Sequence, residues 1–118
     1  MIFIVDDDRG FRGHLRRILR DYVVYEFGDG VAAMEALDDG ELPNLVIFDV
    51  MLPATNCFAM LHEMQSYADT ARVPILILSG VGESLDKESL QEYGVVGVLD
   101  KALCRPEEIL GYAERFAD

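Results

Sequence analysis

The sequence predicts an α/β fold, a single doubly wound sheet of five parallel strands with helices on both faces. Short apolar segments alternate five times with segments that carry apolar residues at helical spacing. The third apolar segment, residues 45–49, has four apolar residues in a row, as is typical of a strand covered on both faces. A chain of 118 residues has room for one such domain, which we place at residues 1–118.

Each element has its own signal in the chain. The strands are predicted at residues 2–5, 23–27, 45–49, 73–79 and 95–101. A polar helix is predicted at residues 83–93, ended by Gly94, and Pro106 is expected to open the last helix. Asn56 is a plausible N-cap for the helix after the third strand. The other helices are predicted from apolar residues that recur at offsets of three and four: Phe11, Leu15, Ile18 and Leu19; Val31, Met34 and Leu37; Phe58, Leu61 and Met64, with Tyr67 as a further candidate; Ile109, Tyr112 or Ala113, and Phe116.

Composition narrows the classes of function. A formal net charge of -12 argues against direct binding of nucleic acid, which requires a basic surface. The two cysteines, Cys57 and Cys104, have no metal-binding spacing and are too few for a disulfide scaffold. We see no signal peptide and no membrane span. These features lead us to expect a reduced, cytoplasmic protein.

Polar side chains stand where the predicted strands end. Asp6 and Asp7 follow the first strand, Asp49 ends the third, and Ser79 and Lys101 end the fourth and fifth. In an open parallel sheet these ends lie at one edge, where ligands bind. Three carboxylates about 5 Å apart repel one another by about 3 kcal/mol per pair at an effective dielectric near 20, so the cluster favours a cation such as Mg²⁺. The hydroxyl and the ammonium suit a phosphoryl group, with a carboxylate as nucleophile.

Each of these residues also has an ordinary structural interpretation. Ser79 could be a turn residue, Lys101 a solvated strand end, and the acids at residues 6–8 a cluster that caps a helix. Taken singly, each structural interpretation is the more probable one. Taken together they are weak, because independent turn residues are not expected to place three acids, a hydroxyl and a lysine at one edge.

With these residues the chain resembles, over its whole length, a response regulator receiver domain of two-component signalling, which has a flavodoxin-like fold. The residues that carry the resemblance are Val5-Asp6-Asp7, Asp49-Val50-Met51-Leu52-Pro53, Ser79 and Lys101. The resemblance implies that Asp49 accepts a phosphoryl group from the phosphohistidine of a histidine kinase or phosphotransfer protein and then switches an output partner. It also implies that Mg²⁺ binds Asp7, Asp49 and the Met51 carbonyl, with Asp6 acting through water. Ser79 and Lys101 would contact the phosphoryl oxygens, and the chain would catalyse only its own phosphorylation and dephosphorylation.

The sequence departs from the family pattern beside the site. Cys57 stands where a glycine is usual, Gly80 follows the hydroxyl residue in place of alanine, and Val98 replaces the usual aromatic. Ala102 replaces the proline that usually follows the lysine, and the connection to the last helix is one residue longer. We therefore expect a trans Lys101–Ala102 bond, with the Lys101 ammonium still directed at Asp49.

Other functions remain open on the sequence alone. A haloacid-dehalogenase-like phosphatase could use Asp6, Asp8, Ser79 and Lys101, although it would leave Asp49 without a role. A flavin-binding protein is less compatible, because the loop after the first strand is acidic and would repel a phosphate. A receiver-like binding module that is never phosphorylated is a third possibility. Arginines on the first predicted helix, Arg12 and Arg16 among them, could help to dock a phosphodonor protein or could simply form a solvated face.

Overall fold

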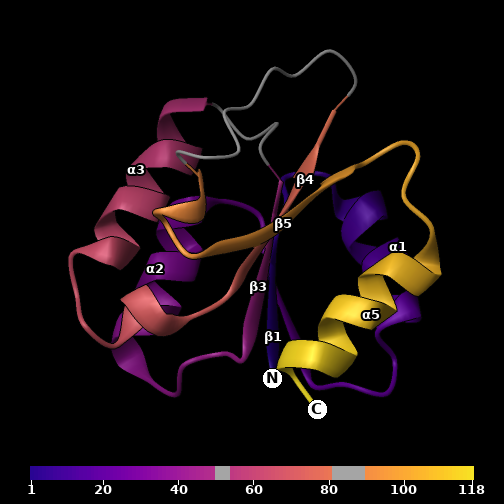
Figure 1. The fold of residues 1–118 in the computed structure, drawn as a ribbon, viewed down its shortest axis with the longest axis horizontal. Helices are drawn as coiled ribbons and strands as arrows, with labels where there is room; N and C mark the ends of the chain where they lie inside the picture. The colour runs from indigo at the N-terminus through magenta and orange to yellow at the C-terminus, as the bar shows by residue number, and fades with distance from the viewer. Residues whose placement is uncertain (50–53, 81–89) are drawn as a thin grey trace.

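The computed structural model describes residues 1–49, 54–80 and 90–118, with backbone only for residues 54–57. Strands and helices alternate in the described part of the chain up to the fourth strand (Figure 1). The strands are β1 (Ile2–Val5), β2 (Val24–Phe27), β3 (Leu45–Asp49), β4 (Ile75–Ser79) and β5 (Val95–Asp100). The helices are α1 (Arg9–Ile18), α2 (Gly30–Asp39), α3 (Ala54–Gln65), the 3₁₀ turn η1 (Thr70–Arg72) and α5 (Pro106–Phe116). The predicted helix at residues 83–93 lies largely outside the described residues.

The five strands form one parallel sheet in the order β2-β1-β3-β4-β5. Helices α1 and α5 cover one face, and α2 and α3 cover the other (Figure 1). The predicted α/β fold is therefore confirmed. Because side chains alternate along a strand, Ile2 and Ile4 pack toward α1 and α5, while Phe3 and Val5 pack toward α2 and α3. The all-buried sequence of β3 at the centre reflects this two-sided cover.

Strand prediction was accurate at the centre of the sheet and less so elsewhere. The bounds of β1 and β3 are those predicted, and α5 begins at Pro106 as expected. The second strand starts at Val24, one residue later than predicted, and the fifth ends at Asp100, one residue earlier. The fourth starts at Ile75, after Pro74, which has no backbone N–H to donate to the sheet. Gly94 has a φ of +79°, which suits the glycine predicted to end the preceding helix.

Several helix predictions were wrong in detail. Asn56 is not an N-cap, because α3 already begins at Ala54. Val31, Phe58 and Tyr67, predicted to face the core, are exposed, and Ala33 and Met60 are buried instead. Spacing alone gives a stripe of apolar residues, whereas the position of the neighbouring helix decides which edge of that stripe is covered.

Candidate functional site

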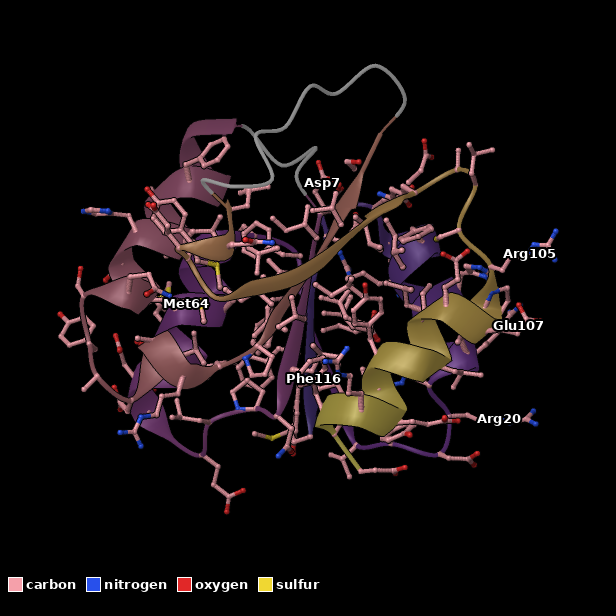
Figure 2. The ribbon with its side chains drawn as sticks, in the orientation of Figure 1. Asp7, Arg20, Met64, Arg105, Glu107 and Phe116 are labelled. Carbon is pink, nitrogen blue, oxygen red and sulfur yellow. The ribbon has the colours of Figure 1, made fainter. Side chains whose placement is uncertain are left out.

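The site lies at the carboxyl ends of β1 and β3, the two neighbours at which the strand order reverses. Such a reversal leaves a crevice between the loops that follow the two strands. Asp6 and Asp7 follow β1, and Asp49 is the last residue of β3. Figure 2 shows Asp7 at this end of the sheet.

Three carboxylates converge in this crevice. Asp6, Asp7 and Asp49 each offer an oxygen, and these oxygens all lie within 4.8 Å of one another. Asp6 and Asp49 are each only 1% exposed, whereas Asp7 is exposed to solvent. Two buried acids and one open acid form a site that a hydrated cation can reach from one side.

Asp6 is the most constrained of the three acids. Its Oδ1 accepts a hydrogen bond from the backbone N–H of Asp8 at 2.8 Å, but its buried Oδ2 has no hydrogen-bond partner among the described residues. That oxygen lies 2.9 Å from the Lys101 Nζ, in an ion pair without the direction of a hydrogen bond. Burial raises the pKa of Asp6, and the ion pair with Lys101 only partly offsets this. A buried carboxylate oxygen at this crevice fits a metal site, where it can bind the ion or one of its waters.

Lys101 supplies the positive charge. Its ammonium donates a hydrogen bond to Asp49 Oδ2 at 3.1 Å, and its side chain is 19% exposed. Burial disfavours the charged lysine, but its contacts with Asp6 and Asp49 outweigh this and raise the pKa of Lys101. The same ammonium lies 4.4 Å from the centroid of the Phe11 ring, within cation–π range. Lys101 is thus held by two carboxylates and one aromatic face.

The turn after β5 positions Lys101, although the residue that follows it is Ala102 and not a proline. The backbone N–H of Lys101 donates to the Ser79 carbonyl at 2.7 Å, which extends the β4–β5 pairing by one residue. The Asp100 side chain then accepts hydrogen bonds from the N–H groups of Ala102 and Leu103. The described residues contain no cis peptide bond, so the predicted trans Lys101–Ala102 bond and the predicted contact with Asp49 are both confirmed.

The remaining predicted site residues are less closely placed. Ser79 ends β4 at the same edge, but the described contacts include none from its hydroxyl to the carboxylates. Met51 lies outside the described residues, as does the side chain of Cys57. Val98 is half-buried on the α2 and α3 side of the core. Gly80 lines a hollow beside Asp49 and Lys101.

The capping role of Asp8 was among the interpretations of the sequence, whereas the place of Phe11 at the site was not. Asp8 caps α1 by accepting hydrogen bonds from Gly10 and Phe11, so the capping interpretation holds for this one acid. Phe11 and Ala102 line the hollow of about 460 Å³ together with Asp7, Asp8, Asp49, Gly80 and Lys101. From its spacing, Phe11 is predicted to be a core residue of α1. No local pattern in the sequence indicates that the Lys101 side chain reaches its ring.

The arginines of α1 have a role that the sequence did not reveal. Arg12 donates one hydrogen bond to the Asp6 carbonyl oxygen at 2.6 Å and another to Glu26 at 3.2 Å. Arg16 also donates to Glu26, at 2.7 Å, and the hydrogen bond from Arg16 leads the effects that lower the pKa of Glu26. Arg12 is therefore a structural link between α1, β1 and β2, whereas Arg16 remains 58% exposed in its side chain.

These features define a doubly wound α/β protein with a carboxylate–lysine cluster at its switch point. Residues 2–114 match the family described as "Response regulator receiver domain", and the chain belongs to this family. It is 33% identical over 114 residues to the response regulator MprA of Mycobacterium ulcerans strain Agy99, covering 92% of this chain and 46% of MprA. The match supports a receiver domain of two-component phosphorelay signalling, and not the phosphatase alternative.

Solved structures agree with this assignment. A putative response regulator from Chloroflexus aurantiacus J-10-fl has a TM-score of 0.83 at 28% identity, over 97% of this chain and 93% of that one. The receiver domain of the sensor histidine kinase PA1611 from Pseudomonas aeruginosa PAO1, described with a magnesium ion in its active site cleft, has a TM-score of 0.81 at 22% identity, over 98% and 94% of the two chains. The second comparison shows the fold alone.

The chain spans less than half the length of MprA, so the activity of any longer protein is a separate question. None of the helices in the described part of the chain combines the length and hydropathy that crossing a membrane requires.

Proposed function

We propose that Asp49 is the phosphoacceptor of this receiver domain. The observation that carries the proposal is the Lys101 ammonium held 3.1 Å from Asp49 Oδ2 in a carboxylate cluster at the switch point. A carboxylate oxygen of Asp49 attacks the phosphorus of a phosphohistidine, the P–N bond breaks, and the imidazole leaves with the electron pair and takes up a proton. Lys101 stabilises the charge on the transferred oxygens, and Ser79 at the end of β4 donates its hydroxyl to them.

The same cluster would hold Mg²⁺. Asp6, Asp7 and Asp49 supply hard oxygen ligands, with the Met51 carbonyl as a further ligand that the resemblance implies and Asp6 acting through water. The buried Asp6 Oδ2 supports this ligand set: besides its ion pair with Lys101 it has no hydrogen bond among the described residues, and a water of the hydrated cation would supply one. When bound, the metal supplies neutralisation of phosphoryl charge. The magnesium ion described for the PA1611 receiver domain is in keeping with this choice.

The partners follow from this chemistry. The donor is a histidine kinase or a phosphotransfer protein in the cytoplasm, and the acceptor of the signal is an output protein or domain. We propose that residues 1–118 act as one domain that catalyses only its own phosphorylation and dephosphorylation. Among the α1 arginines, the exposed Arg16 is better placed than the inward-bonded Arg12 to meet a donor protein.

Intact-mass spectrometry after incubation with acetyl phosphate and Mg²⁺ tests the proposal. We expect the wild-type chain to gain one phosphoryl group and Asp49→Asn to gain none. Asp38→Asn, which removes an exposed aspartate of α2, is the matched control and should label like the wild type. Labelling that persists in Asp49→Asn, or labelling lost only in Asp6→Asn, would favour phosphatase-like chemistry. No labelling of the wild type would favour a binding module.

A further inference from the structure

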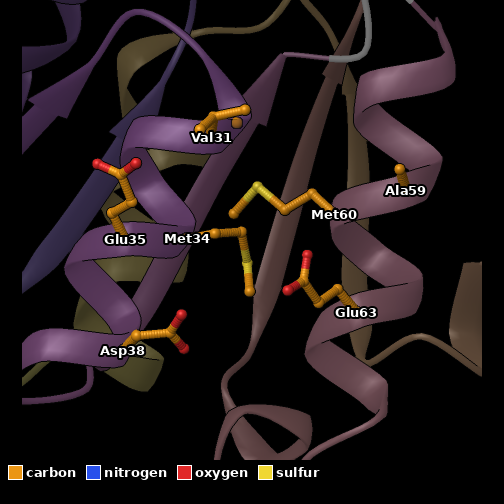
Figure 3. Close-up of a pocket in the computed structure, with 8 residues that line it drawn as sticks. Val31, Met34, Glu35, Asp38, Ala59, Met60 and Glu63 are labelled. Atoms are coloured by element: carbon orange, nitrogen blue, oxygen red, sulfur yellow. The ribbon is translucent and has the colours of Figure 1, made fainter.

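A second acidic region lies on the α2 and α3 side, away from the carboxylate cluster. We call it the α2–α3 groove, a hollow of about 260 Å³ lined chiefly by Val31, Met34, Glu35, Asp38, Met60 and Glu63. Figure 3 shows Met34 and Met60 extending toward each other between the two helices, with Glu63 reaching from α3 toward Met34. Methionine side chains form the floor, and carboxylates stand around it.

The carboxylates of the groove are uncompensated. The sequences of α2 and α3 contain no lysine or arginine. No ion pair in the described part of the chain involves Glu35, Asp38 or Glu63. All three carboxylates are exposed at the rim of the groove. They make the rim a negatively charged surface, which is complementary to a positively charged partner.

The apolar floor of the groove suits an apolar group of the partner, in addition to the positive charge that suits the rim. Val31 is 66% exposed at the edge of the groove, so it adds accessible apolar surface beside the methionines. Methionine is flexible and polarisable, so Met34 and Met60 can adapt to an inserted side chain. The volume is below the roughly 300–1,000 Å³ of small-molecule sites, which favours an anchoring side chain over a metabolite.

We propose that the α2–α3 groove is a docking surface for a basic, amphipathic segment of a partner protein. One apolar side chain of that segment enters between Met34 and Met60, and its lysines or arginines meet Glu35, Asp38 and Glu63. This is the arrangement in which a helix lies in a groove, with the charges fixing its register. The inference is independent of phosphorylation, because the groove shares no residue with the carboxylate cluster.

The probe is a synthetic helical peptide with a leucine stripe flanked by lysines and arginines, and its control has glutamates in their place. In a titration of the full chain followed by amide chemical shifts, we expect the basic peptide to shift residues of α2 and α3, and the acidic peptide to shift none. Shifts confined to α1 and α5, or equal shifts everywhere, would overturn the proposal.

Two sets of variants separate binding at the groove from general attraction to an acidic chain. The triple variant Glu35→Gln, Asp38→Asn, Glu63→Gln should weaken binding about tenfold. The matched triple variant Glu107→Gln, Glu114→Gln, Asp21→Asn removes three exposed acids elsewhere and should bind like the wild type. Equal weakening by both sets would show non-specific attraction to an acidic chain and refute the groove.

Ala59→Phe tests the hollow with its charges intact, because Ala59 is an exposed helical residue that lines it. We expect this variant to keep its melting temperature and to lose most of its affinity for the peptide. Unchanged affinity would refute insertion of an anchor. Two further outcomes would replace the proposal: groove shifts produced by millimolar MgCl₂ without peptide, or self-association in sedimentation experiments that the charge variants abolish.

Discussion

The carboxylate cluster at the sheet edge and the α2–α3 groove both gather three acids, yet they are built differently. In the cluster, two of the acids are buried and share one lysine, with oxygens within 4.8 Å of one another. In the groove the acids stand around methionines, and neither helix carries a lysine or arginine. Convergent buried oxygens suit a small hard cation, whereas separated carboxylates around an apolar floor suit an extended cationic surface.

The largest difference should appear when charge is removed. Lys101→Met removes the ammonium that the buried Asp6 and Asp49 share and should lower the free energy of unfolding by on the order of 3 kcal/mol without metal. Glu63→Gln in the groove should change it by less than about 0.5 kcal/mol. Urea unfolding in the presence of EDTA measures both. Similar changes in the two variants would contradict the contrast between the regions.

A divalent cation should stabilise the protein through the carboxylate cluster and not through the groove. At tenfold above its dissociation constant, Mg²⁺ should raise the free energy of unfolding by about 1.4 kcal/mol. The groove triple variant should show the same gain in thermal unfolding, and Asp49→Asn should lose most of it. If the gain in the free energy of unfolding disappeared in the groove triple variant, Mg²⁺ would bind at the groove and not at the carboxylate cluster.

Asp6→Asn should stabilise the metal-free protein near neutral pH, because it removes the burial cost of the Asp6 charge while Lys101 keeps Asp49 as a partner. Because the pKa of Asp6 is raised in the folded state, the folded chain holds a proton that the unfolded chain has lost, and wild-type stability falls as pH rises through the raised pKa. The advantage of Asp6→Asn should therefore grow as pH rises from the ordinary aspartate pKa and vanish below it. Urea unfolding in EDTA across this range tests the sign, with Asp38→Asn as control.

The smallest expected effect comes from the Phe11 ring, which contacts the Lys101 ammonium. Phe11→Leu keeps an apolar side chain but removes the cation–π contact, which is worth about 0.5–2 kcal/mol. Phosphorylation by acetyl phosphate should slow severalfold in Phe11→Leu and be retained in Phe11→Tyr, while peptide binding at the groove stays unchanged. Equal rates in all three proteins would show that Asp6 and Asp49 alone position the lysine.

Much of this molecule was determined by the sequence itself. Apolar runs and polar strand ends predicted the strand positions, and parallel pairing then requires Asp6, Asp7, Asp49 and Lys101 to meet at one edge. This works because strand alternation and strand ends are local properties of the chain. The same holds for Pro106, whose ring fixes φ at the start of α5, and for Gly94, which is free to adopt the positive φ found after the preceding helix.

Other features were decided only by tertiary structure. The contacts of Lys101 with the Phe11 ring and with Asp6 join residues about ninety positions apart, and the bond from Arg12 to the Asp6 carbonyl joins a helix to a strand end. Val31 and Phe58 had core-like spacing but are exposed, since packing between neighbouring helices decides which flank of an apolar stripe is covered. The groove arises in the same way: Met34 and Met60 follow ordinary helical spacing, and only the approach of α2 to α3 surrounds them with unpaired carboxylates.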